Sequence, residues 1–144
     1  MELFWGGVLT ILALVCWAGQ AFSWLEPALA VRLGIMEAEH TVEPSFFADG
    51  RGEAMWDTAT LWTMVVAGML LTIDQSGWAY FGLVGGGMYL YFAGRGIATR
   101  VAMQHHGLRI GTARNIKIAF AFLTLWGVIA VITIVAAIDS LRSA

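Results

Sequence analysis

Long apolar stretches, separated by shorter polar segments, dominate the hydrophobic pattern of this chain. Four of them cover residues 3–25, 54–73, 78–97 and 116–138. Each is long enough for a helix to cross a hydrocarbon core, which takes about 20 residues. The pattern therefore predicts an all-α fold, an integral membrane four-helix bundle, and one transmembrane domain that occupies residues 1–144.

The composition agrees with this prediction. Of the 144 residues, 59% are hydrophobic and only 12% are charged, whereas a soluble domain has about 25% charged residues. The net charge of −2 argues against nucleic-acid binding, which needs a basic surface. The single cysteine, Cys16, has no partner in this chain for a disulfide, and we expect it to behave as a small buried side chain.

The connections between the apolar stretches carry specific turn signals. The segment from Pro27 to Gly34 predicts a short helix at the membrane interface, with proline at its first position and glycine just past its end. Further along the first connection, Asp49-Gly50 and Arg51-Gly52 predict a tight turn. The segment Asp74–Gly77 is short enough to make the second and third stretches an antiparallel hairpin.

Positive charges indicate the topology. Seven of the eight Lys and Arg residues lie in or beside the first and third connections, and only Arg142 lies elsewhere. The positive-inside rule then places both connections in the cytoplasm and both termini outside. Because the first connection is acidic and the third is basic, we expect the two to pair as a polar cap over one end of the bundle.

Intramembrane charges mark a candidate site near that cap. Reflection of the hairpin about its midpoint places Arg95 close to the depth of Asp57, which predicts an ion pair between them. Glu53 and Asp57 share one helix face and repel each other unless a cation or a proton intervenes, and Arg95 and Arg100 are the nearest cations in depth. These residues form either a structural clamp or a binding site, and snorkelling of Arg95 to the headgroups is a third interpretation.

The third apolar stretch has two different faces. Gly82, Gly86 and Ala93 form a strip of small residues that allows close helix approach, whereas Tyr91 and Arg95 lie on the other side. If Arg95 faces Asp57, the strip turns outward, toward a second copy or another subunit. The alternative is that the strip packs on the fourth stretch within one chain.

Signals for catalysis are sparse. Glu37-x-x-His40 has the spacing of half a di-iron site, but no second such pair exists, so we predict no metal and no cofactor other than a possible bound lipid or quinone. His105 and His106 are adjacent, and on a helix they point in different directions. No serine lies in a nucleophile motif, so no catalytic residue is assigned, and Glu53 and Asp57 remain the candidates for an acid or base.

Several of these features together resemble a known family. They are the four short spans, the segment from Pro27 to Gly34 after the first span, an acidic start to the second helix, and Gly94-Arg95 near the end of the third. This layout resembles the DoxX-like group of small bacterial membrane proteins, although the first connection is longer and more acidic and Gly85–Gly87 is unusual. The resemblance implies that Glu53 and Arg95 form a polar pair. It also implies a relation to a group whose members include quinone-linked subunits of oxidoreductases.

The leading hypothesis is a non-catalytic subunit, or a small lipid- or quinone-binding protein, of a bacterial cytoplasmic membrane. Its partners would be membrane lipids and a second subunit or copy held through the third helix. A second hypothesis is a membrane enzyme acting on an isoprenoid, a quinone or a lipid headgroup, with Glu53 or Asp57 as acid or base and two arginines, Arg95 and Arg100, binding an anion. A small-molecule transporter is the third, and neither an inverted repeat nor a broken mid-membrane helix is evident to favour it.

Overall fold

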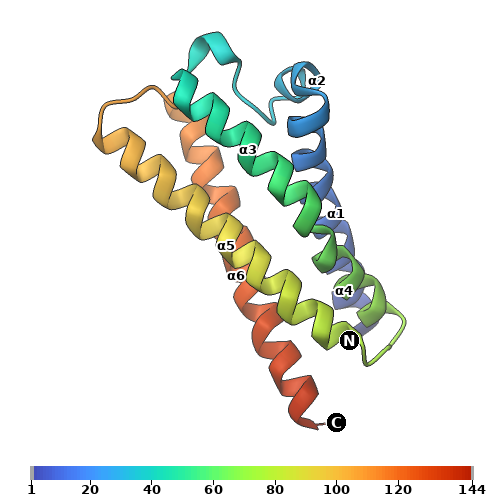
Figure 1. The fold of residues 1–144 in the computed structure, drawn as a ribbon. Coiled ribbons are helices and arrows are strands. Elements are labelled where there is room, and N and C mark those ends of the chain that lie inside the picture. The colour runs from blue at the N-terminus through green and yellow to red at the C-terminus, as the bar shows by residue number, and fades with distance from the viewer. Residues whose placement is uncertain (1, 144) are drawn as a thin grey trace.

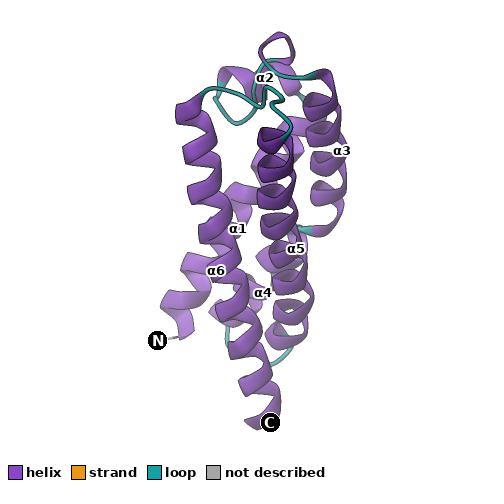
Figure 2. Ribbon diagram, turned by 90° about the vertical axis from the view of Figure 1, so that its left-hand side faces the viewer, coloured by secondary structure: helices purple, strands orange, loops and turns teal. Residues whose placement is uncertain are grey.

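In the computed structural model, which describes residues 2–143, the chain forms helices and connecting loops (Figure 2). The all-α prediction is therefore confirmed for that part of the chain. The elements are α1 (Glu2–Leu25), α2 (Pro27–Arg32), the short 3-10 helix η1 (Glu39–Thr41), α3 (Pro44–Thr60), α4 (Trp62–Thr72), α5 (Trp78–His105) and α6 (Ala113–Ser143).

Two of the turn predictions are confirmed, and one is wrong. Helix α2 begins at Pro27, and Gly34 just beyond it has a φ of 70°, a left-handed conformation that glycine adopts without strain. The segment after α4 turns the chain so that α4 and α5 pack against each other. Residues 49–52, however, lie inside α3, because that helix begins at Pro44 and its two glycines continue it instead of breaking it.

Three helical segments in residues 2–143 are long and apolar enough to cross a membrane: Leu3–Leu25, Pro44–Thr72 and Ala113–Ser143. The second of these comprises α3 and α4. Helix α5, which holds the predicted third span, is not among them, since glycine and tyrosine replace many of the branched apolar residues seen in the other helices. The structure thus supports a helical membrane protein, and the fourth span stays a prediction.

The long helices run side by side, with α2 at one end of the molecule and both chain termini at the other (Figure 1). Helix α1 packs against α2, α3 and α4, and α5 packs against α3, α4 and α6. In the described part of the chain, no Cα atom of α1 comes within 8 Å of a Cα atom of α6. The bundle is therefore open along the side between α1 and α6.

Helices α1 and α4 cross at very short range through two reciprocal pairs of small residues. A Cβ atom on Gly6 would lie 2.6 Å from the backbone nitrogen of Thr72, and a Cβ on Gly68 would lie 2.7 Å from that of Thr10. Each threonine hydroxyl donates a 2.8 Å hydrogen bond to the glycine carbonyl four residues earlier in its own helix. The crossing therefore leaves no threonine hydroxyl unsatisfied, as an apolar setting requires.

The glycine strip of α5 packs inside the chain. A Cβ on Gly86 would lie 2.6 Å from the Ile134 side chain of α6, and Gly82 faces Ala137 of the same helix. On another side of α5, Gly85 allows equally close approach to the backbone of Met64 on α4. Of the two alternatives left open by the sequence, packing on the fourth stretch is correct, and the strip is not an exposed seam for another subunit.

The second predicted span is broken at Leu61, which separates α3 from α4. The carbonyl oxygens of the three residues before it, 58–60, all accept hydrogen bonds from side chains. The donors are the Trp17 indole at 2.8 Å, the Trp62 indole at 2.9 Å and the Thr63 hydroxyl at 2.8 Å. These side chains compensate backbone groups at the break. The interruption lasts for one residue, and Pro44–Thr72 as a whole remains one span candidate.

Candidate functional site

The clamp predicted around Arg95 exists, with one different partner. Arg95 donates a 2.5 Å hydrogen bond to Asp49, and its Nη1 lies 2.9 Å from Glu53 Oε1. The second contact is an ion pair in which the N–H is not directed at the oxygen. The cluster of Asp49, Glu53 and Arg95 fastens α3 to α5. Asp49 was missed because the sequence assigned it to a turn.

The predicted ion pair between Arg95 and Asp57 is absent from the described residues, since Arg95 pairs closer to the loop end of α3. Asp57 is almost fully buried, at 2% exposure, and its Oδ2 has no hydrogen-bond partner there. The reflection that predicted the pair assumes straight helices, whereas α3 ends at Thr60. Asp57 is therefore a core carboxyl group and not part of the clamp.

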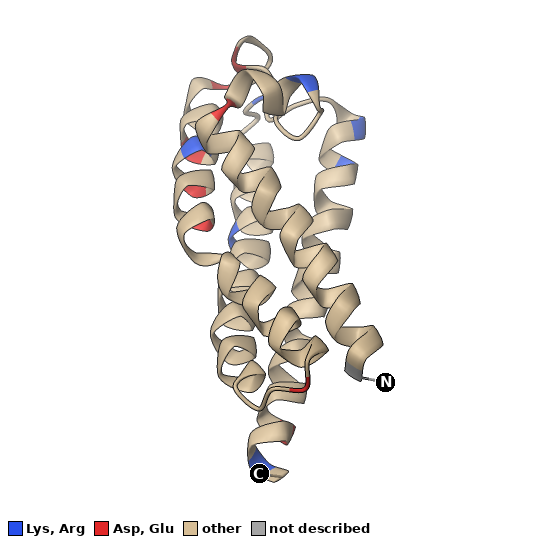
Figure 3. Cartoon of the chain, turned by 90° about the vertical axis from the view of Figure 1, so that its right-hand side faces the viewer, with Lys and Arg blue, Asp and Glu red and all other residues tan. Residues whose placement is uncertain are grey.

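The first and third connections meet at one end of the molecule, as predicted. The backbone N–H of Glu43 donates a 2.8 Å hydrogen bond to the Arg109 carbonyl, and the two side chains form an ion pair at 3.4 Å. Asn115 Nδ2 donates to Glu37 Oε1 at 2.7 Å. Figure 3 shows most of the charged residues gathered at this end. The polar cap is therefore confirmed, and it holds the start of α6 against the segment after α2.

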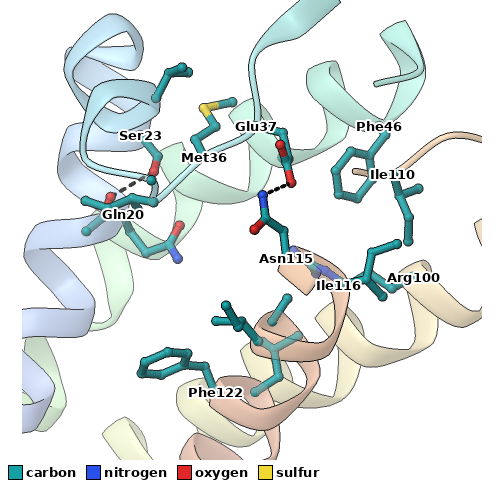
Figure 4. Close-up of a pocket in the computed structure, with 18 of the residues that line it drawn as sticks. Gln20, Ser23, Met36, Glu37, Phe46, Arg100, Ile110, Asn115, Ile116 and Phe122 are labelled. Carbon is teal, nitrogen blue, oxygen red and sulfur yellow. Dashed lines mark hydrogen bonds between the residues drawn. The ribbon is translucent and has the colours of Figure 1, made fainter. Parts of the chain in front are cut away.

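Beneath the cap lies a cavity of about 680 Å³, between α1 and α6 on the open side of the bundle (Figure 4). Its walls come from α1, α2 and the segment after it, α3, α5, the connection before α6, and the first turns of α6. Most lining side chains are apolar, including Ile35, Phe46, Ile110, Ile116 and Phe122. No single helix would have revealed this cavity, because residues far apart in the sequence line it.

Aromatic side chains close the inner end of the cavity. Phe92 of α5 and Trp126 of α6 line it and are 7% and 6% exposed. Behind them, the fully buried Tyr89 packs its ring 5.5 Å from that of Trp126. Cys16, the lone cysteine, lies in the same wall and is buried, as predicted. This end of the cavity is closely packed and largely apolar.

The outer side of the cavity is apolar too. Val15 of α1 and Ile118 and Phe122 of α6 line it and are 65%, 43% and 56% exposed. Because these side chains belong to the two apolar helices that flank the gap, the mouth opens between membrane-span candidates. The cavity is therefore open on the apolar side of the bundle and not just at the polar cap.

A few polar side chains line the end of the cavity near the cap: Gln20, Ser23, Glu37, Thr41, Arg100 and Asn115. In Figure 4 the Gln20 side chain points into the cavity, and Glu37 and Asn115 meet at its upper edge. Ser23 is satisfied within α1 by the Gly19 carbonyl at 2.9 Å. Helical spacing puts Cys16, Gly19, Gln20 and Ser23 on one side of α1, whereas no local pattern pointed to Asn115.

The predicted site residues thus separate into different places. Of the five predicted binding residues, only Arg100 lines the cavity, and Glu53, Asp57 and Arg95 do not. Tyr91 is 57% exposed on α5 and is not among the lining residues either. The acid–base candidates Glu53 and Asp57 are therefore not placed to contact a molecule bound in the cavity.

No group of three or more His, Cys, Asp or Glu side chains suited to a metal ion occurs in the part of the chain that the structure describes. Comparison with known proteins gives no match to a family model, to a curated protein or to a solved structure. The resemblance to the DoxX-like group therefore stays a prediction. The cavity itself is the strongest guide to function.

Proposed function

We propose that this protein is a four-span bacterial inner-membrane protein that binds one amphipathic lipid-class molecule, such as a lipid or a quinone, between α1 and α6. The observation that carries the proposal is the 680 Å³ cavity, which is apolar at its inner end and at its mouth and has its polar groups near the cap. This distribution matches a ligand that has a hydrocarbon chain and a polar head. The volume lies within the roughly 300–1,000 Å³ of small-molecule sites.

A binding role without chemistry has more support than an enzymatic one. The carboxyl groups proposed as acid or base, on Glu53 and Asp57, lie outside the cavity lining, and Glu53 is engaged by Arg95. A general base must come within hydrogen-bond reach of its substrate. The clamp therefore serves to hold the bundle together, and the protein acts as a lipid-binding component or subunit of the membrane, with the capped end in the cytoplasm.

Filling the cavity tests the proposal. At Gly19 a Cβ atom would meet only the Ile35 side chain, at 3.7 Å, so Gly19→Leu fits the helix and projects into the cavity. Gly87→Leu is a matched control, because Gly87 is an exposed helical glycine with open space around it. Both variants replace a helical glycine by the same residue, so a difference between them reports the cavity.

The measurement is native mass spectrometry, with lipid extraction, of protein purified in mild detergent. We expect a co-purified amphipathic molecule in the wild type and in Gly87→Leu, and its loss in Gly19→Leu. A folded wild-type protein that carries no such molecule, and takes none up from added lipid extract, would contradict the proposal. Equal retention by both variants would place the ligand outside the cavity.

A further inference from the structure

We propose that Arg100 makes this cavity selective for amphiphiles with an anionic head, a carboxylate or a phosphate. The proposal rests on the proposed function, since it specifies the head of the bound molecule. Among the described residues that line the cavity, Arg100 is the only one with a cationic side chain. It lies on α5, near the polar end of the cavity and away from the inner end that Phe92 and Trp126 close.

Arg100 has no anionic partner in residues 2–143. No carboxylate oxygen there lies within 4.0 Å of its guanidinium nitrogens. Its Nη1 donates a 3.0 Å hydrogen bond to the carbonyl of Gly96 in the same helix, and its guanidinium carbon lies 5.5 Å from the centre of the Phe46 ring. These contacts fix the side chain and leave most of its five N–H donors free.

The other charged groups nearby are already engaged. Arg95, five residues earlier on α5, pairs with both Asp49 and Glu53. These two carboxylates also act on the Arg100 charge from a distance, but neither of them lies within 4.0 Å of its guanidinium nitrogens. Glu37, the acidic residue of the lining, accepts a hydrogen bond from Asn115 and packs against Gly111. Arg100 is thus the one charged group of the lining without a polar side-chain partner among the described residues.

A partly buried guanidinium beside an apolar cavity is costly without an anion. Its planar arrangement of donors fits the paired oxygens of a carboxylate or a phosphate. An alcohol or a quinone carbonyl would supply hydrogen-bond acceptors but no charge. An ionised head group close to Arg100 would supply the counter-charge, and the hydrocarbon chain of the same molecule would lie along the apolar walls.

The experiment compares three probes with the same saturated chain: hexadecyl phosphate, palmitate and hexadecanol. Each is added to full-length, delipidated protein in detergent, at a pH that ionises both acids, and binding is measured by native mass spectrometry. We expect the wild type to prefer at least one ionised probe over hexadecanol by about tenfold or more, the range of one charge-assisted hydrogen bond. Comparison of phosphate with palmitate identifies which anion the site takes.

Arg100→Gln removes the charge but keeps hydrogen-bond donors, and we expect it to lose the preference while it still binds hexadecanol. Arg100→Lys should retain part of the preference and shows that charge matters even if Arg100→Gln folds poorly. Arg95→Gln, outside the cavity, should leave the preference unchanged. Equal binding of all three probes by the wild type, or an unchanged preference in Arg100→Gln, would overturn the inference but leave the cavity proposal standing. If none of the probes binds the wild type, the proposed function itself fails for this class of ligand.

Discussion

The hydroxyl group of Tyr89 on α5 donates a 3.0 Å hydrogen bond to the carbonyl oxygen of Ala13 on α1, 76 residues earlier in the chain. The same ring packs on Trp126 of α6. Because the backbones of α1 and α6 do not approach each other, Tyr89 joins them through its side chain. It fixes the spacing of the two helices at the inner end of the cavity.

Replacement of Tyr89 by phenylalanine tests this role. The ring and its packing remain, whereas the hydrogen bond to Ala13 is lost, so we expect Tyr89→Phe to lower the free energy of unfolding by about 1 kcal/mol. Thermal unfolding in detergent, followed by circular dichroism, measures the change. Tyr91→Phe is the control, since Tyr91 is exposed. An equal loss in both variants would show that the hydrogen bond contributes nothing specific.

Two adjacent glycines in α1 should respond oppositely to alanine. A Cβ on Gly6 would clash with the Thr72 backbone, whereas a Cβ on Gly7 would meet nothing within 4 Å. We expect Gly6→Ala to destabilise the fold by about 1–3 kcal/mol through overpacking, and Gly7→Ala to be neutral or slightly stabilising. Unfolding midpoints of the two variants decide the question, and a harmless Gly6→Ala would show that α1 and α4 can separate easily.

The clamp around Arg95 should contribute to stability and not to ligand binding. Arg95→Gln leaves Glu53 without its counterion in a largely buried position, with 14% side-chain exposure. Breaking a buried pair costs about 3–5 kcal/mol, and partial exposure reduces this, so we expect a loss of about 1–3 kcal/mol by thermal unfolding.

The double variant Arg95→Gln with Glu53→Gln is the control for that prediction. It removes the stranded charge together with its partner, so we expect it to recover part of the stability that the single variant loses. If the double variant is less stable than Arg95→Gln, Glu53 contributes through contacts other than this ion pair.

Cysteine labelling tests the four-span topology. Ser45, Ser76 and His106 are exposed, and Ser76 lies at the opposite end of the bundle from the other two. With Cys16 replaced by alanine, single cysteines at these positions should react with a membrane-impermeant maleimide from different sides. We expect positions 45 and 106 to label from the cytoplasm and position 76 from outside. Labelling of 76 and 106 from the same side would show that α5 does not cross the membrane.

Local signals in the sequence were sufficient for several features of the fold. Pro27 and Gly34 predicted the bounds of the short helix because each acts through its own backbone conformation. Helical spacing also identifies the inward face of the second span, because Met64, Ala67 and Gly68 share one side and are buried, whereas Met69 lies on the reverse side and is exposed.

Features that depend on contacts between distant segments were not predictable. Glycines at positions 50 and 52 indicated a turn, but packing of α3 on α1 overrides local preference. The partner of Arg95 was displaced to Asp49, since the depth calculation could not include a break at Leu61. The cavity combines residues of α1, α5 and α6, and no pattern within one helix encodes it.

The position of the mouth determines how a ligand would be exchanged. Val15 and Phe122 flank the cavity on the apolar helices α1 and α6, so a molecule dissolved in the bilayer can enter sideways without crossing the aqueous phase. Occupancy would then follow the mole fraction of that molecule among the surrounding lipids and not its concentration in water. Dilution of a membrane suspension would leave the protein loaded, whereas dilution of the membrane with foreign lipid would empty it.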